Sequence, residues 1–437
     1  MNLLLILVGK FILFFSKTFN LGSGSTWPGH IALEINPNFI RQVLKKNPDL
    51  KIVLVAGTNG KTTTATLLRH ILEKSKINVF QNEEGANLLN GIGSSIIKNS
   101  NVFGKLNFDT ALFEVDENSL PLILDEFEPN ILVLLNLFRD QLDRYGEVNT
   151  VADKWSKSLQ KLKKTKLIVN GDHPELAWMA KESNLKSYYF SIPQNLMKSK
   201  FPEDDADFLY CPNCKTKLNF NKISFSSLGL FECPKCEFSN PESKVLNLSN
   251  PLTGDYNYYN VEAASVVASE IFGTPLVNIE NAFKTFKPAF GRQEVFEKVG
   301  KKIMVILSKN PASLNRSFEA VLSVKKDNDS LLMVLNDRIP DGRDISWIWD
   351  TDFENFIPNF KNITVSGDRC YDLGLRIKYG MENQSAGRRT KIKIFENLKE
   401  AIGKAANETS TNETLFILPT YSAMLEVRKI LSGRKIL

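Results

Sequence analysis

Short apolar runs alternate with longer amphipathic stretches through the first half of the chain. The run at residues 51–57, KIVLVAG, leads through a polar segment into ATLLRHILEKS, which has the spacing of a helix. Similar apolar runs at 110–115, 130–137 and 165–170 are separated by intervals long enough to hold helices. This alternation is typical of βαβ units and predicts a mostly parallel sheet.

The alternation stops between about residues 200 and 246 and then returns. The 200–246 stretch is polar, is rich in lysine and asparagine, and contains two CxxC pairs, so we interpret it as an inserted metal-binding module. After residue 297, strand-length runs again alternate with helix-length intervals, which predicts a second, doubly wound domain. These runs lie at 303–307, 331–335, 363–366, 391–395 and 415–419.

These patterns predict an α/β protein in three parts. Residues 1–46 form an apolar helix and a lead-in, and residues 47–296 form a central parallel-sheet domain that carries the insertion. Residues 297–437 form a Rossmann-like α/β domain.

The apolar start of the chain needs a separate interpretation. Residues 2–15, NLLLILVGKFILFF, are interrupted by Lys10 and fall short of the ~20 apolar residues that a membrane span requires. We expect a helix that packs on the body of the protein. A peripheral contact with a membrane is the alternative.

Composition excludes several classes of protein. With 43% hydrophobic and 24% charged residues the chain is typical of globular proteins. A net charge of +6 over 437 residues is too mild to indicate nucleic-acid binding. Five cysteines are too few for a secreted disulfide scaffold, and the CxxC pairs favour a reducing compartment, so we expect a cytoplasmic protein.

The strand at 51–57 runs into GTNGKTTT, a glycine turn placed between a strand and a helix. A strict P-loop would have glycine where Val55 stands, but the physical requirements of a phosphate site are met. Backbone N–H groups cradle phosphates, a lysine reaches the terminal oxygens, and a threonine hydroxyl binds Mg²⁺. The residues in these roles are Gly57, Thr58, Asn59, Gly60, Lys61, Thr62 and Thr63.

AGTNGKTTT resembles the ATP-binding signature of the Mur ligase superfamily, whose members join a carboxylate to an amine through an acyl phosphate. The resemblance implies that Glu114, in ALFEVDE, binds Mg²⁺ together with Thr62. It also implies ATP contacts from Asn257 and Asn260, in GDYNYYNVEAA, and from Arg292, in GRQE.

Two further segments resemble the family with differences. NLFRDQLDRYG at 136–146 resembles a segment that contacts metal, but Gln141 replaces the usual histidine. Lys154 stands where the family often has a carbamylated lysine that bridges to a second Mg²⁺. A solvated helix lysine is the alternative for this residue.

The insertion contains the pairs CPNC and CPKC, separated by 18 residues. Two such turns are a standard way to place four thiolates tetrahedrally around Zn²⁺, and a closed site of this kind is structural because it leaves no position for a water. The predicted ligands are Cys211, Cys214, Cys233 and Cys236.

About 50 residues precede the phosphate loop, which is too few for the UDP-binding domain of the murein ligases, since a domain needs ~100. With the insertion and the segment DGRDISWIWD, the chain resembles the branch of the superfamily that amidates lipid II. That resemblance implies ATP-dependent conversion of the D-glutamate α-carboxylate to D-isoglutamine in cell-wall synthesis. The ammonia comes from glutamine, hydrolysed by a separate GatD-type glutaminase subunit in a heterodimer.

The same resemblance assigns Asp350 to the partner's active site, where a carboxylate would orient the catalytic histidine. Asp341, Asp344 and Asp352 are rivals for this role, and a helix cap is the structural alternative. The residues themselves also favour a separate glutaminase: once four cysteines bind zinc, only Cys370 remains, and GDRCYDLG lacks the glycine-flanked turn of a nucleophile.

Two other functions compete with this interpretation. A folylpolyglutamate-synthase-like ligase also lacks the UDP domain, but the zinc pairs and SWIWD argue against it. A zinc-ribbon NTPase that acts on nucleic acid would need a basic stripe, which the mild charge does not favour.

Overall fold

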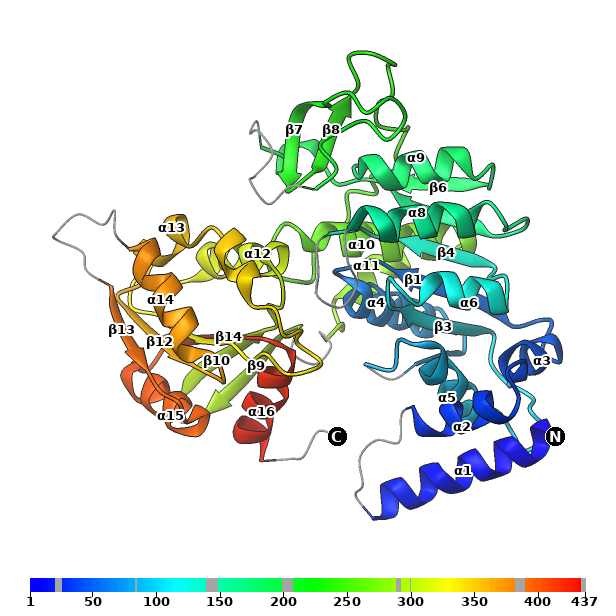
Figure 1. Ribbon diagram of the computed structural model, residues 1–437, viewed down its shortest axis with the longest axis horizontal. Helices are drawn as coiled ribbons and strands as arrows, with labels where there is room; N and C mark the ends of the chain where they lie inside the picture. Colours follow the sequence, from blue (N-terminus) through cyan, green and yellow to red (C-terminus); the bar gives the residue numbers. More distant parts are fainter. Residues whose placement is uncertain are drawn as a thin grey trace.

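The computed structural model describes residues 1–19, 26–82, 85–138, 148–198, 207–287, 292–298, 300–381 and 390–433. Two α/β bodies stand side by side, and a small hairpin projects from the first of them (Figure 1). The fold class expected from the sequence is confirmed.

The first body is built on a parallel six-stranded sheet with the order β2-β3-β1-β4-β5-β6. Both faces are covered, so its inner strands are almost continuously apolar. The strands are β1 (Lys51–Ala56), β2 (Val79–Gln81), β3 (Thr110–Val115), β4 (Ile131–Leu134), β5 (Lys166–Asn170) and β6 (Ser187–Phe190).

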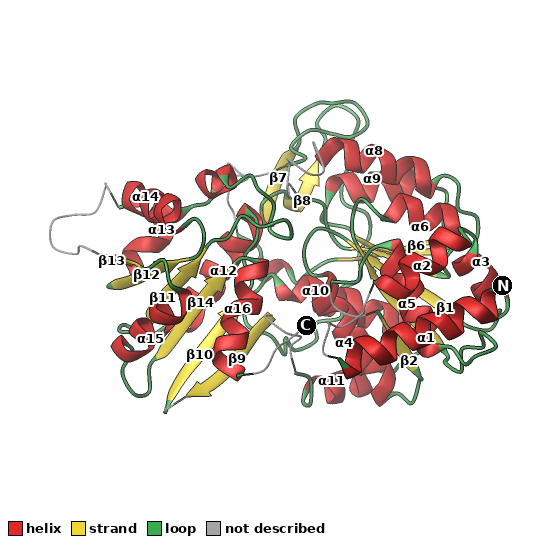
Figure 2. Cartoon of the chain, turned by 60° about the horizontal axis from the view of Figure 1, so that its bottom comes forward, coloured by secondary structure: helices red, strands yellow, loops and turns green. Residues whose placement is uncertain are grey.

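The helices of this body form two layers, one on each face of the sheet (Figure 2). One layer consists of α4 (Lys61–Lys74), α10 (Asn257–Val266), the π-helical turn η2 (Val267–Ile271) and α11 (Leu276–Phe283). The other consists of α5 (Leu89–Asn99), α6 (Leu120–Glu126), α8 (Val148–Leu159) and α9 (Pro174–Glu182), and a short turn, η1 (Gln194–Leu196), follows β6.

The start of the chain is helical and lies on the second of these layers. The helices are α1 (Asn2–Thr18), α2 (Trp27–Ile35) and α3 (Phe39–Lys45). Leu5 and Ile6 of α1 are buried in the core beneath them. Among the described residues, no helix is long and apolar enough to cross a membrane.

The insertion forms an antiparallel hairpin of β7 (Asn219–Phe225) and β8 (Leu228–Glu232), flanked by two turns that carry the cysteine pairs. Its small apolar core includes two of the cysteines and Ala177 of α9, so the module packs directly on the first body.

The second body has a six-stranded sheet with the order β13-β12-β11-β14-β10-β9. Its edge strand β9 is antiparallel and begins at Arg292, before the domain boundary that the sequence predicts at 296/297. The remaining strands are β10 (Lys301–Ile306), β11 (Ser330–Val334), β12 (Asn362–Ser366), β13 (Lys391–Ile394) and β14 (Thr414–Pro419). Its helices are α12 (Pro311–Val324), η3 (Ser346–Asp350), α13 (Phe353–Phe356), η4 (Ile357–Asn359), α14 (Cys370–Gly380), α15 (Leu398–Glu408) and α16 (Tyr421–Ser432).

Candidate active site and metal centre

The phosphate loop lies between the end of β1 and the start of α4, as the sequence predicts. Gly60 caps α4 with a left-handed backbone, at φ +88°. A Cβ atom at this position would lie 2.1 Å from Asn260 Oδ1, so only glycine fits there without a shift. The loop and α10 are therefore packed backbone against side chain.

Asparagine side chains fix the shape of the loop. Asn136, at the end of β4, accepts from the backbone N–H of Asn59 at 2.9 Å and donates to its carbonyl at 3.0 Å. On the other side, Thr64 Oγ1 donates to Asn260 Oδ1 at 3.2 Å, and Asn260 in turn donates to Asn257 Oδ1 at 2.9 Å. Asn257 and Asn260, expected to contact ATP, thus lie against the loop.

Lys61 is buried, and its ammonium is held within the loop. Its Nζ donates to the carbonyls of Gly57 at 2.5 Å and Thr58 at 3.1 Å, and to Glu117 Oε2 at 3.1 Å. Burial acts to raise the pKa of Glu117, but the positive charges of Lys61 and Lys309 outweigh it and hold that pKa below its usual value. Glu117 therefore neutralises Lys61 at the place where a bound phosphate would also carry negative charge.

Glu114, at the end of β3, has the features of a cation ligand. Its backbone is fixed by Asn82, which accepts from Glu114 N and donates to Glu114 O, each at 2.9 Å. Its Oε2 is buried and has no hydrogen-bond partner among the described residues. A buried carboxylate oxygen without a donor fits a hard cation such as Mg²⁺, as does the hydroxyl of Thr62, buried in the first turn of α4.

A pocket opens beside the loop, and both bodies supply its walls. Its lining includes Asn59 and Asn260 from the first body, Ile306 and Arg316 from the second, and Phe225 from the hairpin. The bodies also meet directly, because Asn310 Nδ2 lies 3.4 Å from Asn59 Oδ1.

Asn310 begins α12 with a capping box. Its side chain accepts from Ser313 N at 2.8 Å, while Ser313 Oγ accepts from Asn310 N at 3.0 Å, and Pro311 follows at the first helical position. Asn310 and Pro311 therefore begin the helix that faces the pocket.

A larger groove adjoins the pocket and shares Tyr256 and Arg316 with it. Asp350 and Trp349 line this groove and are exposed. Arg376 holds their segment in place: its Nε donates to Ile348 O at 3.1 Å and its Nη2 to Thr351 O at 2.8 Å.

The three rival aspartates are buried or accept local hydrogen bonds. Asp344 Oδ1 accepts from Ser346 N at 2.8 Å, and Asp352 is the N-cap residue of α13. Asp341 is buried and accepts from Ser422 N at 2.7 Å. Of these four aspartates, Asp350 alone combines exposure with a place in the groove.

Other expected site residues are exposed or lie outside the part of the chain that the structure describes. Lys154 lies exposed on α8. Residues 139–147, which include Gln141, lie outside the described part, as does the side chain of Arg292. Glu117 was not singled out from the sequence, although its place in EVDE, three residues after Glu114, was a usable signal.

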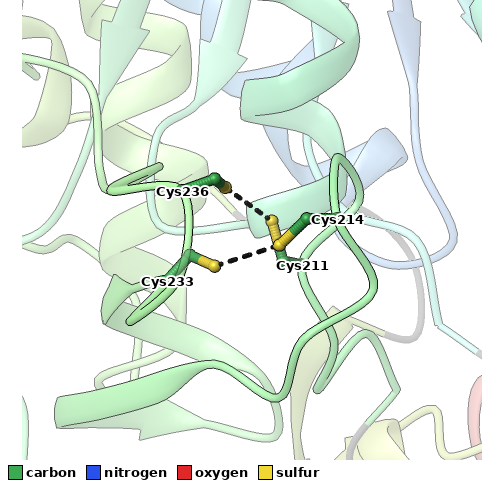
Figure 3. Close-up of side chains that lie close together, drawn as sticks. All are labelled: Cys211, Cys214, Cys233 and Cys236. Carbon is green, nitrogen blue, oxygen red and sulfur yellow. Dashed lines mark hydrogen bonds between the residues drawn. The ribbon is translucent and has the colours of Figure 1, made fainter.

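The four predicted zinc ligands come together (Figure 3). Their Sγ atoms all lie within 4.8 Å of one another, close to the ~3.8 Å that a tetrahedron with Zn–S bonds of ~2.3 Å requires. Each pair ends in a left-handed residue, Lys215 or Glu237, whose N–H donates to the carbonyl of the first cysteine of its pair. The two matching turns fit a closed Zn²⁺ site.

A buried polar network connects the hairpin to the pocket. Asp172 Oδ2 accepts from Tyr259 at 2.9 Å and from Ser191 at 2.7 Å, and Asn240 Nδ2 lies 3.4 Å from its other oxygen. Tyr259 lines the pocket, and Asn240 follows the second cysteine turn. Burial raises the pKa of Asp172 to about 7.

Comparisons with known proteins agree with this arrangement. The Mur ligase middle domain model matches residues 55–268, and the MurT ligase C-terminal model matches residues 307–424. The MurT subunit of lipid II isoglutaminyl synthase (glutamine-hydrolyzing) from Staphylococcus aureus strain COL is 33% identical over 377 residues, covering 81% of this chain and 83% of that protein. The subunit of the same name from Streptococcus pneumoniae strain R6 is 30% identical, covering 95% and 94%.

Solved structures agree on the fold. The MurF ligase of Thermotoga maritima, solved in complex with ADP, superposes with a TM-score of 0.60 at 16% identity, covering 90% of this chain and 81% of that one. The resemblance to the Mur ligases that the sequence indicated is thus confirmed. The extent and identity of the matches show that this chain belongs to the MurT family of Mur ligases.

Proposed function

We propose that the chain is the ATP-dependent synthetase subunit of a lipid II isoglutaminyl synthase in peptidoglycan synthesis. The observation that carries the proposal is a complete phosphate loop, with a buried Lys61, in a chain that matches its MurT relatives over most of both lengths. In this reaction the α-carboxylate of D-glutamate in lipid II becomes the amide of D-isoglutamine.

The reaction has two steps. A carboxylate oxygen attacks the γ-phosphorus of ATP, the bond to ADP breaks, and an acyl phosphate forms. Ammonia then attacks the acyl carbon, the tetrahedral intermediate expels phosphate, and a proton leaves the nitrogen to give the amide. Water competes with ammonia for the acyl phosphate, so the site has to exclude it.

The loop residues have the roles that the first step needs. The ammonium of Lys61 is held within the loop, where it would neutralise the charge of a bound phosphate. Mg²⁺, held by Thr62 and Glu114, would supply further charge neutralisation on the phosphates. Arg292, by the family resemblance, would add a contact to ATP, and a carbamylated Lys154 would belong to a second metal site.

The ammonia would come from a GatD-type glutaminase subunit. Four of the five cysteines lie in the zinc cluster, and the fifth, Cys370, is buried, which raises its thiol pKa. That environment disfavours the thiolate a glutaminase nucleophile requires. The partner would therefore supply the nucleophile, and Asp350 would orient its histidine.

The groove gives the ammonia a short way in. Tyr256 and Arg316 line both cavities, so the groove that contains Asp350 adjoins the pocket at these two side chains. Ser323 of α12 lines the groove, whereas the exposed Val324 beside it does not. In the complex, Ser323→Trp should uncouple glutamate release from amidation, while Val324→Trp should not. Full coupling in Ser323→Trp would exclude this route.

We place this activity in the cytoplasm, at the inner face of the plasma membrane. ATP is the phosphoryl donor, zinc thiolates need reducing conditions, and the proposed substrate is lipid-linked.

Reconstitution tests the activity. The chain, a GatD-type partner, ATP and glutamine should convert lipid II to a product whose stem peptide loses the mass difference between a hydroxyl and an amino group. Lys61→Ala should abolish both ADP formation and this product, and it should also lower stability because it leaves the buried Glu117 without its partner. If the chain instead adds glutamate to a folate, the alternative ligase activity is correct.

Asp350→Asn tests the partner site separately. Glutaminase activity of the complex should fall strongly, by up to the ~10⁴-fold seen for the aspartate of a catalytic triad, and ammonia at high pH should still support amidation. Asp352→Asn, two residues away, is the matched control and should leave glutaminase activity unchanged. Normal glutaminase activity in Asp350→Asn would refute the role of this residue.

A further inference from the structure

The outward face of α1 is apolar, although the helix is already packed on the protein. We infer that this face, together with Trp27 of α2, docks the chain on an anionic lipid bilayer. The inference rests on the proposed function, because a lipid-linked substrate places the enzyme at a membrane. We call these residues the docking face: Leu4, Leu7, Phe11, Phe14 and Trp27.

The inner side of α1 is fully used in packing. Leu5 and Ile6 are 5% and 1% exposed, and Gly9 lies so close to α5 that a Cβ atom there would come within 2.8 Å of Ile97. These contacts fix the rotation of the helix, so its opposite side must point outward. In Figure 1 α1 lies along the lower edge of the first body, and in Figure 2, where that side comes forward, α1 crosses in front of this body.

The outer side repeats at helical spacing. Leu4 is 63% exposed, Leu7 43%, Phe11 62% and Phe14 66%, which places a side chain every three or four residues on one stripe. Trp27, at the start of α2, is 64% exposed. A surface helix with a solvated outer face would carry polar residues at these positions.

This exposure is concentrated at one end of the chain. Of the 25 large apolar side chains that are exposed in the described part, eleven lie between residues 1 and 35. Soluble monomers rarely expose a contiguous apolar patch larger than a few hundred Å², and larger patches mark contact sites. Phenylalanine and tryptophan are also the residues that settle at the boundary between head groups and acyl chains.

The charges favour a bilayer over a second copy of the chain. Residues 1–33 contain Lys10 and Lys17 and no aspartate or glutamate, the first acidic residue being Glu34. Lys10 is half-buried and its Nζ donates to the carbonyl of the exposed Lys98 of α5 at 3.3 Å, so basic charge lies beside α1 as well as on it. A segment with basic charge and no acidic charge is attracted to anionic lipid head groups, whereas two copies of it would repel each other. At 17 residues α1 is too short to cross the membrane and would lie in its surface.

The test uses the full chain bound to its partner subunit and vesicles of phosphatidylcholine with or without phosphatidylglycerol. The wild type should cosediment with the anionic vesicles and bind the neutral ones more weakly. Phe11→Glu with Phe14→Glu should lower binding to anionic vesicles at least tenfold. The matched control, Leu122→Glu with Val277→Glu, changes two residues that are 61% and 64% exposed elsewhere on the same body and should leave binding unchanged.

A kinetic measurement separates docking from the chemistry. The Phe11/Phe14 variant should show a raised KM for lipid II in vesicles and an unchanged kcat and KM for a water-soluble, short-chain analogue. If neither the wild type nor any variant amidates lipid II, the proposed function is refuted. The vesicle-binding measurement still tests the docking face in that case. Failure of the wild type to bind anionic vesicles, or a dimer that the Phe11/Phe14 variant dissociates, would overturn the inference.

Discussion

Asp172 makes the stability of the first body depend on pH. In the unfolded chain its carboxyl has an ordinary pKa near 3.8, whereas burial raises the pKa to about 7 in the folded protein. Between these values the folded protein keeps a proton that the unfolded chain has lost. Stability therefore falls as the pH rises from about 4 to about 7, and this contribution is constant outside that window.

The size of the effect follows from the shift. A difference of about three pKa units, at 1.36 kcal/mol per unit, corresponds to about 4 kcal/mol. Asp172→Asn removes the titration, since an amide resembles the protonated carboxyl in shape and charge. Part of this window lies below pH 5, so the free energy of unfolding of this variant, relative to wild type, should be about 2.6 kcal/mol more favourable at pH 8 than at pH 5.

Thermal unfolding with zinc present at both pH values measures this difference. For a domain of this size it corresponds to a relative change in Tm of about 8 °C. Ser191→Ala is the control, because it removes one hydrogen bond to Asp172 but leaves the carboxyl able to titrate. That variant should lose stability and keep the pH dependence, which should extend to higher pH because the lost hydrogen bond had lowered the pKa of Asp172. If Asp172→Asn differs from wild type by the same amount at pH 5 and pH 8, the buried carboxyl does not hold its proton as we argue.

Three further predictions concern the loop and the metal. Gly60→Ala should lower the free energy of unfolding by at least ~1 kcal/mol, because residue 60 has a left-handed backbone and a Cβ atom there would contact Asn260. This variant should also bind ATP more weakly in calorimetry, and wild-type affinity would contradict the packing of the loop. Glu117→Gln should lower the free energy of unfolding by ~3 kcal/mol, because it leaves the buried Lys61 without its partner. Bound phosphate would restore a negative charge beside Lys61, so MgATP should raise the Tm of this variant more than that of wild type. Equal shifts would argue against the ion pair. Cys211→Ser should remove bound zinc in metal analysis and expose the hairpin to protease, whereas a resistant, zinc-loaded variant would disprove a structural site.

The sequence predicted those features that depend on residues close together in the chain. The strand runs at 51–57 and 110–115 became β1 and β3 because burial on both faces requires continuous apolar runs. The cysteine pairs came together because each CxxC turn fixes two thiolates locally, and only one hairpin was needed to join the turns. The glycine turn was likewise specified by its immediate neighbours.

Features that depend on strand order were not predicted. Glu117 meets Lys61 across 56 residues because β1 and β3 are adjacent and parallel, which brings both segments to the same edge of the sheet. The clamp by Asn136 arises in the same way from the pairing of β1 with β4. The antiparallel strand β9 was missed because its composition does not differ from that of a linker. Hydrophobic period alone carries no information about which strands become neighbours.

The zinc-binding hairpin is not a separable appendage. Its strand β7 ends in Phe225, which forms part of the pocket wall and lies 4.7 Å beneath the guanidinium of Arg316 from the second body. Asn240, after the second cysteine turn, donates to the carbonyl of Gly171 in the first body at 3.1 Å and to that of Gly229 in β8 at 2.9 Å. Deleting this module would remove one wall of the pocket and a contact with Arg316 of the second body. A chimera that takes this module from a homologue therefore has to take the cysteines, Phe225 and Arg316 from the same protein.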